Sequence, residues 1–390
     1  MQAATKALEA TRRERTVSPS LVSQLREQSE SQARLLIEND GRFQTCGLMQ
    51  ELMERSEEAI LQADQQGAIR LARLATLVAN KVDPEILGEA VTNDLRGRAA
   101  TRLGNAYRYG GELRAAAECL RHADSLLAAG TGDPLEKANL LSIRASLALA
   151  TGAYAEALDL LSRAERIYQA LDESQLLGKV FVQKASVVGW DDPHRGIALS
   201  FLAEDHLDSA QDARLFLVAR HNRIIWMLDA DQVEEAATLF EASRPLYRQF
   251  DDEWTLLHQG LAEARLALAL EDLEEAEISL QVLLDELLAR GQQLNAALCA
   301  LDLADCYLLQ GEPRKASELA AAMAQNLRAW GAHDRAREAW AVLQHALALE
   351  RATGDLLRQL ARYLHRAWRN PNLPFRPGLN TRSSPPILRS

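Results

Sequence analysis

Four consecutive polar residues, Arg220-His221-Asn222-Arg223, interrupt an otherwise apolar helical pattern and are the first candidates for chemistry. Successive residues of a helix point in different directions, so these side chains cannot converge on one site. Two interpretations stay open. Either His221 or Arg220 faces a binding groove, or the run is a solvated helix surface, which we favour.

Two further stretches contain residue types that bind metals. Trp190-Asp191-Asp192-Pro193-His194 combines carboxylates with an imidazole, but no second group of ligands follows at a recognisable spacing. We interpret it as a turn between helices. Cys299 and Cys306 lie seven positions apart, roughly two helical turns, and are predicted to be core residues. The sequence therefore predicts no metal and no cofactor.

Carboxylates are plentiful but are not arranged for acid–base catalysis. In Leu273-Glu274-Glu275-Ala276-Glu277 the adjacent glutamates cannot form a convergent pair on a helix, and we read them as an exposed face. The chain has no glycine-rich phosphate loop, no serine elbow and no H-E-x-x-H motif. We predict that it is not an enzyme.

The C-terminal segment differs from the rest in charge. From Glu350 onward eight arginines stand against two acids, whereas the whole chain carries a net charge of −11. Arg358, Arg362, Arg366 and Arg369 recur at the spacing of one helix face. Such a strip could bind an acidic partner or nucleic acid, or it could pair with the acidic body of its own chain, which we favour.

Composition indicates a helical protein. Of the 390 residues, 47% are hydrophobic and 25% charged, as is ordinary for folded proteins, and Ala, Leu, Glu and Arg dominate. The net negative charge argues against general binding to nucleic acid or to anionic membranes. No stretch is apolar for long enough to span a membrane, and no signal-peptide pattern opens the chain. Four cysteines without a C-x-x-C motif predict reduced thiols in the cytoplasm.

The best-patterned stretch, residues 97–127, predicts two short amphipathic helices around a glycine turn. Small residues recur where two helices must cross closely. The pattern is carried by residues Ala100, Leu103, Gly104, Tyr107, Gly111, Ala116, Leu120 and Ala123.

This spacing resembles the tetratricopeptide repeat, with Ala100 in the place of the family's tryptophan and Leu120 in the place of its phenylalanine. Equivalent alanines recur along the chain at intervals of 41, 41, 38, 40 and 40 residues after the first gap, longer than the standard unit and similar to the repeats of some bacterial regulators. They are Ala68, Ala116, Ala157, Ala198, Ala236, Ala276 and Ala316.

The resemblance implies an all-α fold, a right-handed superhelical α-solenoid of antiparallel helix pairs with an N-terminal helix and C-terminal capping helices. We expect a polar segment and a helix in residues 1–41, with the helix beginning at Ser18-Pro19. About seven helix pairs follow in 42–331, capping helices in 332–369 and a disordered tail in 370–390.

In this family the first helices of successive pairs line a concave wall that binds peptides. The resemblance places on that wall Arg98, Thr101, Asn105, Arg108, Tyr109, Asn139, Ser146, His221, His258, Arg265 and Asp305. Asn105 matches the family's peptide-gripping asparagine, but Thr101 occupies a position of the basic carboxylate clamp, which is therefore out of register. Asn105 and Arg108 could equally be ordinary solvated residues.

Two functions follow from the resemblance. The first is a non-enzymatic scaffold or adaptor that binds a protein or peptide in its groove. The second is a signal-sensing regulatory subunit that responds to a peptide or small ligand. This subunit could control transcription through a separate effector chain, because one N-terminal helix is too few for a helix-turn-helix head. The identity of the partner and the oligomeric state stay open.

Overall fold

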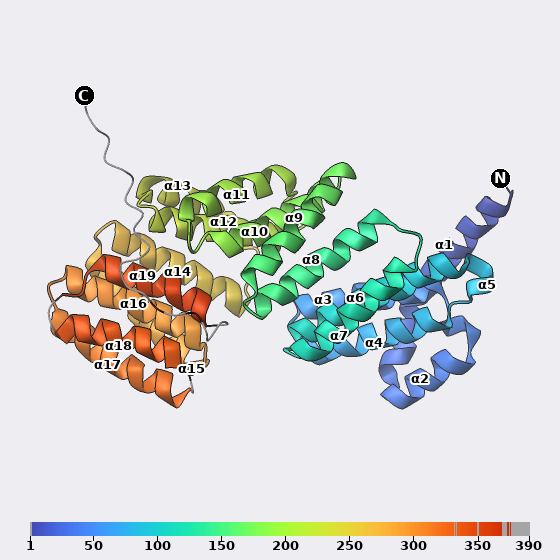
Figure 1. The fold of residues 1–390 in the computed structure, drawn as a ribbon, viewed down its shortest axis with the longest axis horizontal. Coiled ribbons are helices and arrows are strands. Elements are labelled where there is room, and N and C mark those ends of the chain that lie inside the picture. The colour runs from blue at the N-terminus through green and yellow to red at the C-terminus, as the bar shows by residue number, and fades with distance from the viewer. Residues whose placement is uncertain are drawn as a thin grey trace, which may run out of the picture. The chain divides into compact units, whose positions relative to one another are not determined.

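The computed structural model describes residues 2–330, 332, 334–348, 351–368, 373 and 375. In these ranges the chain forms nineteen α-helices, one 3-10 helix and no strand, which confirms the all-α class (Figure 1). The helices divide between two compact units, Met1–Glu173 (unit 1) and Ser174–Ser390 (unit 2). Each unit is an α-solenoid in which successive helices pack as antiparallel pairs.

Unit 1 opens with two helices and then builds three pairs, α3/α4, α6/α7 and α8/α9. Its elements are α1 (Gln2–Glu27), α2 (Glu30–Asn39), the 3-10 helix η1 (Gly41–Phe43), α3 (Cys46–Leu61), α4 (Gln65–Lys81), α5 (Pro84–Leu87), α6 (Glu89–Tyr109), α7 (Leu113–Ala128), α8 (Pro134–Ala150) and α9 (Tyr154–Ala170).

Unit 2 contains five pairs, α10/α11 to α18/α19. Its elements are α10 (Ser174–Val188), α11 (Pro193–His206), α12 (Ala213–Asp229), α13 (Val233–Tyr247), α14 (Glu253–Ala269), α15 (Leu273–Ala289), α16 (Gln293–Leu309), α17 (Pro313–Ala329), α18 (Asp334–Ala348) and α19 (Gly354–Ala367).

The predicted helix start at Ser18-Pro19 is wrong, because α1 runs through Pro19. A tertiary contact explains why the helix continues on the N-terminal side of the proline. The backbone N–H of Gly47 in α3 donates to the Glu14 carboxylate at 3.1 Å, and a Cβ at Gly47 would lie 2.7 Å from the Glu14 Cβ. This close packing of α1 on α3 overrides the local break that proline favours.

A common turn joins the two helices of most pairs. One residue adopts a left-handed φ, the next caps the second helix, and a fully buried small residue follows four positions after the cap. In α6/α7, for example, these are Gly111, Glu112 and Ala116. The left-handed residues of the other turns are Ala63, Gly152, Asp231, Glu271 and Gly311.

The α10/α11 turn departs from this scheme and corrects one predicted position. Asp192 caps α11, so the residue four positions later is Gly196, which is buried, whereas Ala198 is exposed. A Cβ at Gly196 would lie 2.6 Å from the Cα of Gly189 and 2.9 Å from the Trp226 ring. Only glycine fits there, so a search for a repeating alanine misses the position. The other predicted stripe alanines, Ala68, Ala116, Ala157, Ala236, Ala276 and Ala316, are fully buried.

The last helix does not follow the stacking order of the others. The second helices α11, α13, α15 and α17 pack on the first helix of the next pair, whereas α19 packs on α16 of the preceding pair and on its own partner α18, both first helices. Leu357, Leu360 and Leu364 anchor it in the core of unit 2. The predicted disordered tail lies outside the described residues except for Leu373 and Phe375, which pack against that core.

Candidate functional site

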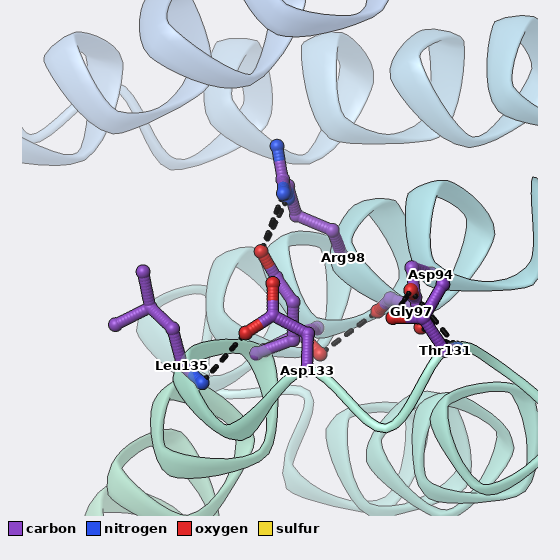
Figure 2. A network of polar contacts seen from close by, with 8 residues as sticks. Asp94, Gly97, Arg98, Thr131, Asp133 and Leu135 are labelled. Carbon is purple, nitrogen blue, oxygen red and sulfur yellow. Dashed lines mark hydrogen bonds and ion pairs between the residues drawn. The ribbon is translucent and has the colours of Figure 1, made fainter. Parts of the chain in front are cut away.

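The wall residues predicted in unit 1 are engaged in contacts within the fold. Arg98 of α6, labelled in Figure 2, contacts Glu136 of α8, with Nε 2.8 Å from the carboxylate. Beside it Asp94 accepts the Thr131 backbone N–H at 3.1 Å and holds the α7–α8 loop. Thr101 is buried and donates its hydroxyl to the Gly97 carbonyl at 2.9 Å. The Arg98–Glu136 contact joins neighbouring repeats, and the Thr101 bond lies within α6, so both side chains are engaged in the fold.

Further along the same helix, Asn105 is buried and accepts from the Arg108 guanidinium at 2.9 Å. Arg108 also lies over the Tyr109 ring, 4.1 Å from its centroid, and Tyr109 is exposed. Asn139 of α8 accepts the hydroxyl hydrogen of the buried Tyr168 at 2.8 Å. Among the predicted wall residues of unit 1, therefore, the Arg108–Tyr109 pair is the one accessible to a ligand.

Unit 2 contains a cavity of about 140 Å³ on the inner side of its first helices. Four of the predicted wall residues, His221, His258, Arg265 and Asp305, line it together. They come from three successive first helices, α12, α14 and α16, and α19 closes the cavity from the opposite side.

Arg265 occupies the polar end of the cavity. Its Nη2 donates to the Asp229 carboxylate at 2.7 Å, and its Nε lies 3.5 Å from Asp302. These carboxylates raise the pKa of Arg265 further above its usual value against the opposing effect of burial, so the guanidinium is always charged. A buried cation held by two anions on neighbouring helices fixes their spacing.

Two acids near Arg265 have raised pKa values. Burial raises the pKa of Asp302 to about 6, although the Arg265 charge opposes the shift. Burial also raises the pKa of Asp305, against the opposing charge of Arg358. A Cβ at Gly354, the first residue of α19, would lie 3.0 Å from Asp305, so glycine there allows the helix end to approach this carboxylate.

Beyond the polar end, His258 and His221 line the cavity. Trp254 stacks on His258 at 4.1 Å, and His258 meets His221 edge-on at 4.9 Å. His258 Nδ1 donates to the Trp254 carbonyl at 2.7 Å, and His221 Nδ1 lies 2.9 Å from the Tyr247 hydroxyl. Burial lowers the pKa of both imidazoles, so both rings are neutral at neutral pH.

The rest of the lining is mainly apolar. Leu257, Leu261 and Leu298 contribute side chains from α14 and α16. Cys299 also borders the cavity, but its thiol donates to the Leu280 carbonyl, and burial raises its pKa well above the usual value. A protonated, hydrogen-bonded thiol is a poor nucleophile, so the geometry favours binding over covalent chemistry.

The prediction that Arg220–Arg223 is a solvated surface is wrong for two of its members. His221 is 2% and Arg223 3% exposed. Arg223 Nη2 lies 2.8 Å from Glu204 of α11, and the guanidinium stacks over Phe201 at 4.1 Å. A charged side chain can be buried here because its partner comes from the preceding helix, which local sequence does not reveal. Cys299 and Cys306 are core residues, as predicted.

One of the C-terminal arginines pairs with an acid of the repeat body of unit 2, in line with the alternative favoured from sequence. Arg366 pairs with Asp191 of the α10–α11 turn at 3.2 Å, and His365 stacks on Trp190 at 3.7 Å. Arg358 pairs with Asp355 one turn earlier, and Arg369 lies outside the described residues. Trp190, Asp191 and Asp192 lie in a helix–helix turn, as predicted, whereas Pro193 and His194 begin α11. The first two residues of this turn contact α19.

Sequence reasoning missed Asp229, Asp302, Trp254 and the cavity-lining part of α19. A signal for the two acids was available. Arg265 lies 36 positions from Asp229 and 37 positions from Asp302, all three on successive first helices. Searching the predicted first helices for opposite charges at that offset would have found both acids.

The described residues contain no group of three or more His, Cys, Asp or Glu side chains placed to hold a metal ion. None of the described helices combines the length and the apolar character that a membrane span requires.

Sequence comparison with known proteins gives no relatives: no family model matches the chain, and no curated protein matches it significantly. Comparison with solved structures does find similar folds. A Rap protein complexed with competence and sporulation factor has a TM-score of 0.60 at 14% identity, over 81% of this chain and 87% of that one.

Two other solved structures are similar. Aspartyl phosphate phosphatase F from Bacillus subtilis gives a TM-score of 0.56 at 15% identity, over 76% of this chain and 72% of its own. NprR in complex with its cognate peptide NprX gives 0.53 at 16% identity, over 78% and 83%. At such identities the likeness shows the fold, and the chain is a helical-repeat protein with a tetratricopeptide-like solenoid architecture.

Proposed function

We propose that this chain is a non-enzymatic regulator of the tetratricopeptide type that binds a peptide or protein segment in the cavity of unit 2. The observation that carries the proposal is the meeting of His221, His258, Arg265 and Asp305 around one cavity. Apolar walls with a few fixed polar groups are typical of ligand sites. The four free cysteines are compatible with a reducing cytoplasm.

The similar folds support a peptide as the ligand class. Two of the solved structures are described as complexes, one with competence and sporulation factor and one with the peptide NprX. At the size of the cavity, one or two ligand side chains would enter, while the backbone of the peptide stays outside. A ligand with an apolar side chain next to a hydrogen-bonding group matches this lining, because Leu261 offers an apolar contact and Asn222 a hydrogen-bonding amide.

The test is selection of peptides from a random displayed library on the immobilised full chain, followed by calorimetry with the selected peptides. Asn222→Ala and Leu261→Ala should weaken binding, each by about 1–2 kcal/mol, because they truncate cavity-facing side chains. Arg108→Ala in unit 1 is the matched control and should bind as the parent does. If Arg108→Ala abolishes binding while the cavity variants retain it, the ligand binds unit 1 and the proposal fails.

A second candidate is a ligand-responsive sensor, favoured by the contact between α19 and the α10–α11 turn. These elements lie at the two ends of unit 2, so a ligand that alters the contact would alter the curvature of the unit. X-ray scattering of the full chain with and without a selected peptide tests it. Superimposable profiles at saturating peptide would contradict the sensor function, and the scaffold function would then be the remaining proposal.

A further inference from the structure

The last helix of the chain lies where a ligand of unit 2 would lie. α19 packs on α16 and α18, two first helices, and contributes Arg358, Ala361, Arg362 and His365 to the cavity lining. First helices form the inner face of such solenoids, so α19 covers the inner face of its own unit.

The two sides of the helix are held unequally. Leu357, Leu360 and Leu364 are at most 2% exposed and fix its body in the core. The same side of the helix continues to Ala367, which is fully buried in that core. The other side of the helix end meets the α10–α11 turn through the His365–Trp190 stack and the Arg366–Asp191 ion pair. We call these four residues the latch.

The latch is weak in comparison with the body of the helix. Arg366 and Asp191 keep 37% and 47% of their side chains accessible, and ion pairs so exposed contribute little. One aromatic stack adds a modest contribution. Trp190 and His365 also line the cavity, so separating them opens its wall on this side.

We propose that α19 is a built-in strap over the groove of unit 2 and that the latch limits access to the cavity. The proposal rests on the proposed function in one respect, since it takes the cavity to be the ligand site. A ligand enters when the His365 side of α19 and the α10–α11 turn separate, while Leu357, Leu360 and Leu364 keep the helix attached. Binding then competes with the latch.

The test compares the double variant Asp191→Asn/His365→Ala with the parent in the full chain. Asp355→Asn is the matched control, because it breaks an exposed ion pair of α19 that does not cross the groove. Arg366→Gln is a milder variant that keeps the aromatic stack, in case the double variant folds poorly. Amide hydrogen exchange reports opening, and the association rate of 1-anilinonaphthalene-8-sulfonate reports access.

Energy transfer from tryptophan makes the dye readout specific for unit 2, because all six tryptophans lie there. The cavity-filling variant Leu298→Phe, which adds no tryptophan donor, identifies the fraction of dye that enters the cavity. We expect the double variant to accelerate both exchange at residues 360–367 and dye entry, each about tenfold, and Arg366→Gln to accelerate both about threefold. Asp355→Asn should change neither.

Two results overturn the proposal. Unchanged exchange in α19 would show that the latch does not hold the helix, and accelerated exchange with unchanged dye entry would show that the helix does not limit access. Neither readout uses a peptide, so failure to select any peptide would count against the proposed function and leave the strap standing.

Discussion

Arg265 of α14 donates to Asp229 of α12 at 2.7 Å, while its Nε faces Asp302 of α16 at 3.5 Å. One guanidinium thereby connects three successive first helices on the inner side of unit 2. Repeats in a solenoid contact only their neighbours, and contacts of this kind keep the walls of a groove at a fixed separation.

Replacing Arg265 by methionine should destabilise unit 2 by about 3–5 kcal/mol, because two carboxylates lose their cation in a buried position. Urea unfolding followed by tryptophan fluorescence measures the effect in this unit, which contains all the tryptophans. Arg314→Met on α17, an exposed position, is the control and should unfold as the parent does. An Arg265→Met protein with the parent's midpoint would show that the network contributes no net stability.

Asp302 should give unit 2 a specific dependence on pH. Burial raises its pKa to about 6, whereas an unfolded aspartate titrates near about 3.9. Between these values the folded chain holds the extra proton, so this group's contribution to the free energy of unfolding falls as the pH rises from about 4 through 6. Asp302→Asn cannot titrate and should lack this fall.

The measurement is the difference in the free energy of unfolding between the parent and Asp302→Asn at several pH values. From pH about 4.5 to about 7.5 the parent should lose about 1–2 kcal/mol relative to the variant. Other groups titrate in both proteins, so their contributions to the difference in the free energy of unfolding largely cancel. Asp285→Asn, on an exposed position of α15, should give a curve parallel to the parent's. A parallel curve for Asp302→Asn would refute the prediction.

Two helical glycines of unit 2 should respond to alanine in opposite directions. In Gly196→Ala the new Cβ would lie 2.6 Å from the Gly189 backbone, so overpacking should cost about 1–3 kcal/mol. Around Gly260 a Cβ would meet nothing within 4 Å, and Gly260→Ala should stabilise by about 0.5–1 kcal/mol. Ala198→Leu, at the exposed position, should have little effect. Fluorescence-detected unfolding distinguishes the three, and a destabilised Ala198→Leu would contradict the corrected register.

Arg98 should prove structural. Glu136 is 5% exposed and has Arg98 as its cation, so Arg98→Met should leave a poorly solvated carboxylate and cost unit 1 about 1–3 kcal/mol. Hydrogen exchange at residues 134–150 measures this loss. The control Arg114→Met breaks an exposed pair in α7 and should leave the exchange unchanged. If exchange in α8 is the same in both variants, Arg98 is available to a ligand.

Much of the fold could be predicted because one physical requirement recurs in every repeat. A small residue must follow the cap of the second helix, and Ala116, Ala236 and Ala316 meet it. The errors occur where a tertiary contact determines the residue type or the helix bounds. Gly196 replaces alanine because Gly189 and Trp226 press against it, and α1 passes through Pro19 because Gly47 packs on Glu14.

The candidate site was only partly predictable for the same reason. His221, His258, Arg265 and Asp305 could be placed on a common wall from their positions in first helices. Their partners could not, because Tyr247, Asp229 and Arg358 come from other helices and the pairing depends on how those helices stagger. The contact of α19 with Trp190 has no local signal, since 175 residues separate Arg366 from Asp191.

That long-range contact also limits how unit 2 can change in length over evolution. Solenoids commonly gain or lose whole repeats, since each new pair needs to match only its neighbours. In unit 2 a duplication or deletion between α12 and α17 would carry His365 one repeat away from Trp190 and separate Arg366 from Asp191. A helix that reaches back across its own array fits a single number of repeats.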